Sequence, residues 1–536
     1  MPDFTGEWPP KPWDDAAKQW DVYTSWWAGD VEALEGIYSN PNYVPPRPSQ
    51  LRGGLVGRVA RFWFGRPMLQ DQKRLHIPAP ADVATASADL LFGQPPSWLL
   101  SEGDATDLKA AQARLNEIMD DADTVAVFLE GAETAAALCG VYFRLVWDKT
   151  FCDKVMVSAV PPDAAIPVWR YGKLAEVTFW TTVADDKQGV WRHLEHHSPG
   201  EIEHRLYVGD KGSIGRQMPL DSLPAMQWAA DIVNENSVVD TQIDRLTAAY
   251  VPNVNPARRW RNQPHLAPLG RSDFEGVEHL FDALDEVWSS WMRDIEIAKG
   301  RLFVAQQLLD DQGPGKGAAF DGEQQIFTGV PSDDMGLNDE NGARLVQAQQ
   351  FEIRVDEHER TCEKILKQIL RACGYSAADF DDADSAAMTA TEVSARQGKS
   401  NSTRNRKILY YQSAVQPLAR TALLLDGVVF GHGDYGLSAD PEMKFPVRVD
   451  QDPVSLSTAI SNLRLAKAIS TETAVRMYHP NWSNDEVEEE VERIQHETAL
   501  ENAVVDTPGD FGTHTDPQTS DESDQADQPD GLQEAA

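Results

Sequence analysis

The chain has 536 residues, 41% of them hydrophobic and 25% charged, and 48 Lys and Arg residues stand against 85 Asp and Glu residues, a formal net charge of −37. The length predicts two or three domains, and the apolar content is typical of a globular protein. The charge excludes a protein that coats DNA by neutralising phosphates, because that mode requires clustered Lys and Arg. An acidic protein could still surround DNA without adhering to it, since like charges repel.

The first 15 residues contain no basic stretch followed by an apolar run, so no secretory signal is predicted. No apolar run approaches the ~20 residues that a membrane-spanning helix needs. The cysteines form no CxxC pair, and Cys362 and Cys373 lie about three helical turns, or ~16 Å, apart, too far to bridge. These features indicate a reduced, cytoplasmic chain whose cysteines (Cys139, Cys152, Cys362 and Cys373) are structural.

The N-terminal stretch is rich in tryptophan and proline. Large aromatic side chains need to be buried, so we expect these tryptophans to pack onto the chain's own core. Packing on a neighbouring subunit is the alternative. The residues concerned are Trp8, Trp13, Trp20, Trp26 and Trp27.

Residues 107–121 carry an apolar stripe of helical spacing and predict a helix. A strand-rich block follows from Gly140 to about Val208. Alternating apolar and polar residues at 141–147 and 175–181 predict strands, and Pro, Gly and Asp pairs mark turns between them. The block therefore predicts an antiparallel sheet with helices beside it.

The middle of the chain predicts a helical hairpin. Residues 273–299 have apolar side chains at helical spacing over about 40 Å. A Gly- and Pro-rich, strand-like insert follows, and a second long helix is expected from about 345 to 373. Two long helices flanking a small β insert indicate a hairpin with a capped tip.

An acidic loop then leads into a third long helix, predicted over 389–425, with Pro417 inside it as the expected position of a kink. A strand near 445–449 and helices near 455–468 and 484–500 complete the predicted folded part. The segment 501–536 has ten acidic residues and no Lys or Arg, which predicts a disordered tail.

No sequence pattern indicates catalysis. The run from Gly313 to Gly317 lacks the Gly-Lys-Ser/Thr order of a phosphate-binding loop, and neither a GxSxG nor an HExxH motif occurs. Four histidines cluster near Glu195, but two predicted strands joined by the turn at 198–200 should send them to different faces. We therefore interpret them as solvated or paired across strands rather than as a metal site. They are His193, His196, His197 and His204.

Local sequence and the order of elements resemble the portal proteins of tailed double-stranded DNA bacteriophages, in the siphovirus-type form typical of phages with actinobacterial hosts. The resemblance covers about residues 55–500. It is carried by the residues at 61–65, 75–78, 87–96, 272–276, 290–294 and 389–393.

The resemblance implies an α+β, portal-type fold. Its expected parts are a Trp/Pro-rich N-terminal arm (1–54), a β-rich wing (55–270), a first stem helix (271–299), a small β clip (300–344), a second stem helix (345–375), a tunnel loop (376–388), a long kinked spine helix (389–426), a return to the wing (427–454), a helical crown (455–500) and the disordered acidic tail (501–536).

It also implies a ring oligomer, a dodecamer, forming a DNA channel at one capsid vertex for genome packaging and ejection. The implied partners are the large terminase subunit, the head–tail adaptor, the major capsid and scaffolding proteins, and double-stranded DNA that passes without sequence-specific contacts. Assembly in the host cytoplasm and a place in the virion follow, with no membrane, no catalytic residue, no cofactor and no metal. The implied channel residues are Asp379, Asp381, Asp382 and Asp384, and the implied clip interface residues are Arg301, Phe303, Lys316 and Phe327.

Two other functions remain open at this stage. An internal virion or scaffold protein would form no channel, and negative-stain images of a closed ring would distinguish it. A metal-dependent hydrolase or nuclease using the 193–204 region would contain metal after purification.

Overall fold

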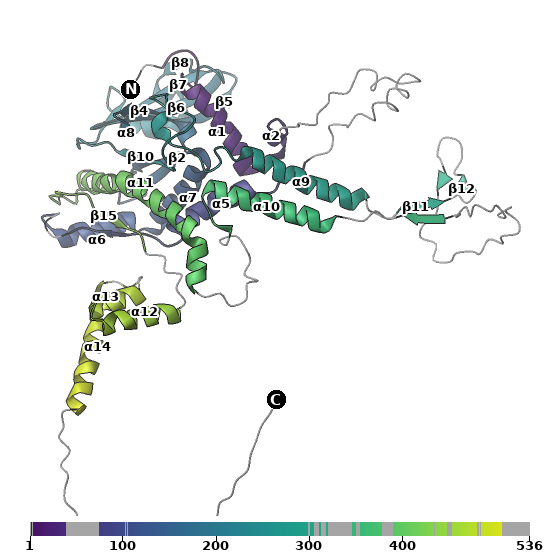
Figure 1. Ribbon diagram of the computed structural model, residues 1–536. Coiled ribbons are helices and arrows are strands. Elements are labelled where there is room, and N and C mark those ends of the chain that lie inside the picture. The colour runs from purple at the N-terminus through teal and green to yellow at the C-terminus, as the bar shows by residue number, and fades with distance from the viewer. Residues whose placement is uncertain are drawn as a thin grey trace, which may run out of the picture. The chain divides into compact units, whose positions relative to one another are not determined.

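The computed structural model describes residues 2, 4–38, 74–101, 103, 105–297, 301–304, 310–311, 318–319, 346–349, 354–377, 390–433, 435–446, 453–479, 482 and 484–505 (Figure 1). The chain divides into two compact units, residues 1–448 and 449–536. No helix in the described ranges is both long and apolar enough to cross a bilayer.

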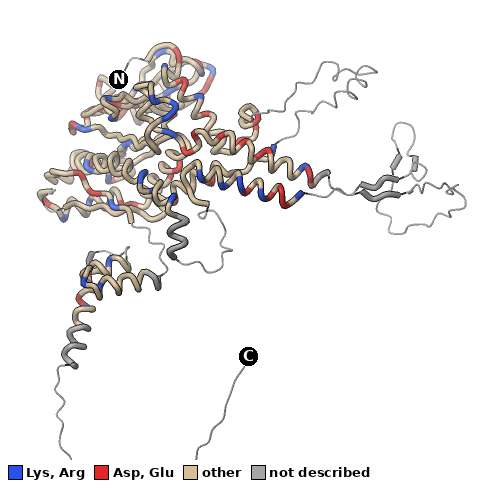
Figure 2. Tube along the Cα trace, in the orientation of Figure 1, with Lys and Arg blue, Asp and Glu red and all other residues tan. Residues whose placement is uncertain are grey.

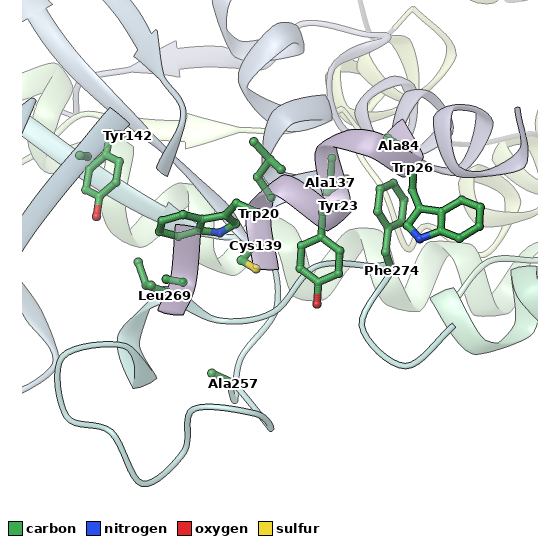
Figure 3. Packing of buried hydrophobic residues seen from close by; sticks show 14 of the residues in the cluster. Trp20, Tyr23, Trp26, Ala84, Ala137, Cys139, Tyr142, Ala257, Leu269 and Phe274 are labelled. Atoms are coloured by element: carbon green, nitrogen blue, oxygen red, sulfur yellow. The ribbon is translucent and has the colours of Figure 1, made fainter. Parts of the chain in front are cut away.

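The N-terminal tryptophans pack into the chain's own core, as the sequence predicts. Helix α1 (Trp13–Ala28) is followed by the short α2 (Val31–Glu35), and α1 buries Trp20, Tyr23 and Trp26 against the rest of the first unit (Figure 3). Trp20 meets Trp260 edge-to-face at 6.4 Å between ring centroids. The described part of the arm, up to residue 38, therefore belongs to the core.

Helices α5 (Ala79–Phe92), α6 (Leu108–Met119) and α7 (Ala122–Leu138) pack on this core and on a second one. Helix α6 confirms the helix predicted over 107–121. Asp107 caps it, because its side chain accepts a hydrogen bond from the Ala110 backbone N–H at 3.1 Å. Strand β1 (Ser97–Leu99) lies between α5 and α6.

Two antiparallel sheets confirm the predicted strand-rich block. The smaller has the order β10-β2-β3 and the larger β4-β5-β6-β7-β8, with β9 also pairing with β7. Their strands are β2 (Gly140–Val146), β3 (Met156–Val160), β4 (Ala165–Arg170), β5 (Lys173–Asp186), β6 (Gly189–Ser198), β7 (Glu201–Gly209), β8 (Arg216–Met218), β9 (Val238–Asp240) and β10 (Ala248–Pro252).

Short helical segments connect these strands to the hairpin that follows. They are η1 (Pro162–Ala164), η2 (Leu220–Ser222), η3 (Pro224–Met226), α8 (Gln227–Ile232) and η4 (Ala267–Leu269). Figure 1 shows the sheets on one side of the first unit and the hairpin projecting from it.

The hairpin consists of α9 (Glu278–Ile297) and α10 (Val355–Cys373), which lie side by side (Figure 1). The predicted start of α9 at 273 is wrong by five residues, because Gly276 adopts a left-handed φ of 84° that interrupts a helix. The predicted start of α10 near 345 is also wrong. Residues Val346–Gln349 form strand β14, which pairs with β11 (Arg301–Val304), so strand pairing overrides the helical pattern there. Strands β12 (Asp310–Asp311) and β13 (Ala318–Ala319) also pair.

Helix α11 (Ala390–Phe430) has 41 residues and contains Pro417, in agreement with the third predicted helix. Strand β15 (Glu442–Lys444) pairs with β1 just before the predicted strand position of 445–449. In the second unit, the sequence predicts two helices, whereas the described residues form three: α12 (Pro453–Leu465), α13 (Thr471–Tyr478) and α14 (Asn484–Val505). Helix α14 includes 501–505, so the tail predicted to be disordered begins too early; residues 506–536 lie outside the described ranges.

Candidate channel and docking elements

The α9–α10 hairpin is fixed to the rest of the first unit through carboxylates of α9. Asp285 is buried and accepts hydrogen bonds from the Ile77 backbone N–H at 2.8 Å and from the Tyr38 hydroxyl at 2.9 Å. His76 Nδ1 lies 2.9 Å from the same carboxylate, and Asp282 pairs with Arg74. Because several donors hold the buried Asp285 carboxylate, the N-terminal half of α9 has a fixed orientation.

A second group of polar contacts joins the C-terminal end of α9 to the N-terminal end of α10. Asp294 on α9 accepts hydrogen bonds from Arg354 Nη2 at 2.9 Å and from His358 Nε2 at 3.0 Å. These two contacts, His358 first, hold the pKa of Asp294 below its ordinary value. The His358 ring also stacks on Trp291, 6.0 Å between centroids. The two helices are therefore joined close to where the β11–β14 insert begins.

A buried polar cluster lies at the base of the hairpin. Lys407 on α11 donates hydrogen bonds from Nζ to Ser87 Oγ at 2.6 Å, Asp273 Oδ2 at 2.7 Å and Tyr375 Oη at 2.9 Å. Asp273 precedes α9, Tyr375 follows α10, and Ser87 belongs to α5, and all of these side chains are buried. This junction therefore links both hairpin helices to the long helix α11 and to the body.

Asp273 has further partners in this cluster. Its Oδ2 accepts from the Tyr375 hydroxyl at 2.7 Å, and its Oδ1 accepts from Asn253 Nδ2 at 2.9 Å. A buried carboxylate with a cation and two neutral donors is well compensated. The ends of the hairpin are consequently held in one arrangement where they meet α11.

Basic residues recur along α10 (Figure 2). They are spaced four, three and four residues apart, which places them on the same side of a helix. All are exposed: Arg360, Lys364, Lys367 and Arg371. They balance the four acidic residues of α10, so this helix does not share the acidic excess of the chain.

Most of the predicted channel and clip residues lie outside the part of the chain that the structure describes. Asp379, Asp381, Asp382 and Asp384 of the predicted tunnel loop lie outside the described residues, as do Lys316 and Phe327. The backbones of Arg301 and Phe303 belong to β11, opposite Gln349 and Gln347 of β14. Strand β14 lies beyond the predicted clip boundary of 344, and its pairing with β11 makes both strands part of one small sheet.

The prediction that the 193–204 histidines face different sides holds for His196 but is wrong for the other three, since His193, His197 and His204 share one face of the sheet. His193 and Glu195 share one face of β6, and the register places His204 of β7 directly opposite Glu195. Ligand atoms of these three buried residues lie within 4.8 Å of one another. The signal was present in the sequence: the two-residue Pro199-Gly200 turn fixes the register that pairs 195 with 204.

Comparison with known proteins completes the description. No curated protein matches the sequence. The similar chains in solved structures include the neck of a native GTA particle computed with C12 symmetry (12% identity, 75% of this chain and 89% of that chain, TM-score 0.35), the neck of an empty GTA particle computed with C6 symmetry (12%, 75% and 90%, 0.36), and the virion of a native gene transfer agent particle (13%, 84% and 98%, 0.36).

The family model for the phage portal protein, SPP1 Gp6-like, matches residues 69–503. This range contains both sheets, the α9–α10 hairpin, α11 and residues 449–503 of the second unit. The chain is a mixed helix-and-sheet protein, and the matched family is structural rather than enzymatic. Because the match covers most of the sequence, the chain belongs to the SPP1 Gp6-like family of phage portal proteins.

Proposed function

We propose that this protein forms a closed ring at one capsid vertex, and that genomic DNA passes through the ring during packaging and ejection. The observation that carries the proposal is the portal-family match over residues 69–503. In this proposal the sheets form the wing, α9 and α10 the stem, the β11–β14 insert the clip, α11 the spine and α12 to α14 the crown.

The large terminase subunit and then the head–tail adaptor would dock on the clip, and the capsid and scaffolding proteins would surround the wing and crown. A ring of this kind needs no catalytic residue, since a docked motor supplies ATP hydrolysis. The resemblance of the local sequence motifs further supports a siphovirus-type phage of an actinobacterial host. Assembly would take place in the host cytoplasm, and the assembled ring would be a component of the virion.

Exposed apolar side chains on the hairpin support a ring. Trp288 and Trp291 are only half-buried, and Ile295, Val355 and Leu366 are exposed in the single chain. Such side chains gain free energy when neighbouring copies cover them. A ring would place copies of the hairpin next to one another and bury these surfaces.

Negative-stain electron microscopy of the purified full-length protein tests the ring. We expect closed rings, predominantly twelve-fold, with some miscounted rings when the protein is expressed alone. Sedimentation should give a large oligomer at micromolar concentration. A stable monomer under these conditions would contradict the proposal and favour an internal virion or scaffold protein without a channel.

The clip can be tested by deletion. Replacing residues 301–349 by a short Gly/Ser linker should leave rings intact, because α9 and α10 already contact each other through Asp294, Arg354 and His358. Pull-down of the large terminase subunit and of the adaptor should fail. The single substitution Asp294→Asn, with the insert intact, serves as the control that should retain docking. Loss of rings in the linker variant would show that the insert is an assembly element.

The acidic loop that contains Asp379, Asp381, Asp382 and Asp384 is proposed to line the channel. Changing all four to Lys should impair packaging and ejection, because the new cations would attract DNA phosphates, while rings still assemble. Changing all four to Asn is the matched control and should have a milder effect, since it removes repulsion without adding attraction. The difference should shrink with added salt, as the Debye length is only ~8 Å at physiological ionic strength. Normal packaging by the four-Lys variant would place this loop away from DNA.

A further inference from the structure

A second feature of the fold lies in the larger sheet, away from the hairpin. His193 and Glu195 of β6 and His204 of β7 occupy one face, and each is at least nine-tenths buried. His193 Nε2 lies 3.0 Å from His204 Nδ1, and their rings are nearly parallel, with a 3° angle between planes. Two imidazole nitrogens and a carboxylate therefore point into one small volume.

The protonation states of these groups suit metal binding. Burial, followed by the neighbouring His204, lowers the pKa of His193 to about 4, and burial also lowers the pKa of His204. Burial alone would raise the pKa of Glu195, but the hydrogen bond from His197 and the charge of Arg144 outweigh it and lower the pKa. At neutral pH both imidazoles are neutral and the carboxylate is ionised, which are the forms that bind a metal.

The distance between the two imidazole nitrogens also suits a small divalent ion. Zn²⁺ binds His nitrogen at about 2.0–2.1 Å with tetrahedral angles, which places two ligand nitrogens about 3.3 Å apart. The observed 3.0 Å between His193 Nε2 and His204 Nδ1 needs only a small ring rotation to reach this value. We propose that His193, Glu195 and His204 bind one divalent transition-metal ion of the Zn²⁺ type, with a water molecule as the fourth ligand.

Surrounding residues would orient these ligands. Glu195 Oε1 lies 2.7 Å from His197 Nε2, and His197 Nδ1 lies 2.6 Å from Thr247 Oγ1, so the carboxylate is held by an ordered chain of contacts. Such outer contacts are typical of metal sites. Arg144 Nη1 donates to Glu195 Oε2 at 2.7 Å. Its positive charge opposes the cation and is expected to reduce the affinity, because like charges repel.

A tryptophan of α8 covers the site and provides a route for the ion. The Trp228 ring stands edge-on to both imidazoles, with centroids 5.8 Å from His193 and 5.9 Å from His204. Trp228 is 51% exposed, so a rotation of this side chain would open the site to solvent. The bound ion would join β6 to β7 next to α8 and would serve as a structural element of the sheet.

The test uses the tag-free full-length protein, stripped with EDTA and dialysed. Co²⁺ titration should give one ion per chain, with the visible absorption bands of a four-coordinate site. His193→Gln and His204→Gln should each lower the affinity by about tenfold or more. His196→Gln is the matched control, because His196 is a buried residue of the same strand on the opposite face, bonded to Thr178. It should bind Co²⁺ like the wild type.

A measurement on the wild type alone covers the case in which a variant does not fold. Saturating Zn²⁺ should raise the melting temperature of the stripped protein, because a ligand that binds only the folded state stabilises it. The proposal is overturned if Zn²⁺ gives no shift and Co²⁺ gives no visible bands. It is also overturned if the folded variants bind Co²⁺ as tightly as the wild type. In either case His193 and His204 form only a hydrogen-bonded pair.

Discussion

Lys407→Met is expected to lower the free energy of unfolding by about 3–5 kcal/mol, the range for removing one partner of a buried ion pair. Lys407 and Asp273 are buried with 2.7 Å between Nζ and Oδ2. Methionine has a similar volume but no charge, so the buried Asp273 would lose its cationic partner. Equilibrium unfolding in urea or guanidinium measures the loss.

Two further variants separate the charge effect from packing. Arg406→Met changes the adjacent, exposed residue of the same helix and should alter the free energy of unfolding by no more than about 0.5 kcal/mol. The double variant Asp273→Asn with Lys407→Met removes both charges and should recover part of the stability. The losses of the single variants Lys407→Met and Asp273→Asn are the reference. If the double variant loses as much free energy of unfolding as these two together, the pair is not coupled and the explanation fails.

The same junction predicts an effect on the local stability of the hairpin. Because Lys407 links Asp273 before α9 and Tyr375 after α10 to α11, its loss should loosen the base of the hairpin before the sheets unfold. Hydrogen exchange should therefore accelerate first in α9 and α10. Uniform acceleration across both sheets would show that the junction supports the whole unit equally.

Acidification from pH 7.5 to about 4 is expected to destabilise the metal-free protein strongly through buried histidine. Burial and the neighbouring His204 lower the pKa of His193 from 6.5 to about 4. Above pH 6.5 the residue is neutral in both the folded and unfolded chains. As the pH falls below 6.5 the unfolded chain binds a proton first, so stability is lost progressively until about pH 4. A shift of this size corresponds to about 3 kcal/mol for His193.

Urea unfolding midpoints at pH 7.5 and 4.5 measure this effect. The His193→Gln variant cannot take up the proton, so it should lose about 2.5 kcal/mol less than the wild type between the two pH values, if it folds. His279→Gln, a change of an exposed histidine on α9, is the matched control and should follow the wild type. Equal losses in wild type and His193→Gln would show that the acid sensitivity arises from other groups.

Local pattern was sufficient to predict much of the secondary structure. Helix α6, the long helix α11 around Pro417 and the alternating strands β2 and β5 follow from apolar spacing, because side chains repeat every 3.6 residues in a helix and every two in a strand. The helix starts were less predictable. Gly276 with its positive φ delays α9, and the pairing of β14 with β11 delays α10.

Contacts between distant residues were decided by the tertiary structure alone. The Asp273–Lys407 pair joins positions 134 residues apart, and Trp20 meets Trp260 across a much longer stretch of sequence. Apolar spacing shows that a residue is buried but not which residue it contacts, since many partners satisfy the same pattern. The His193–Glu195–His204 cluster depends partly on the local sequence and partly on the tertiary structure. Strand alternation and the Pro199-Gly200 turn determine that the three side chains share a face, whereas their burial depends on Trp228, Arg144 and the second sheet, which only the packed fold brings to them.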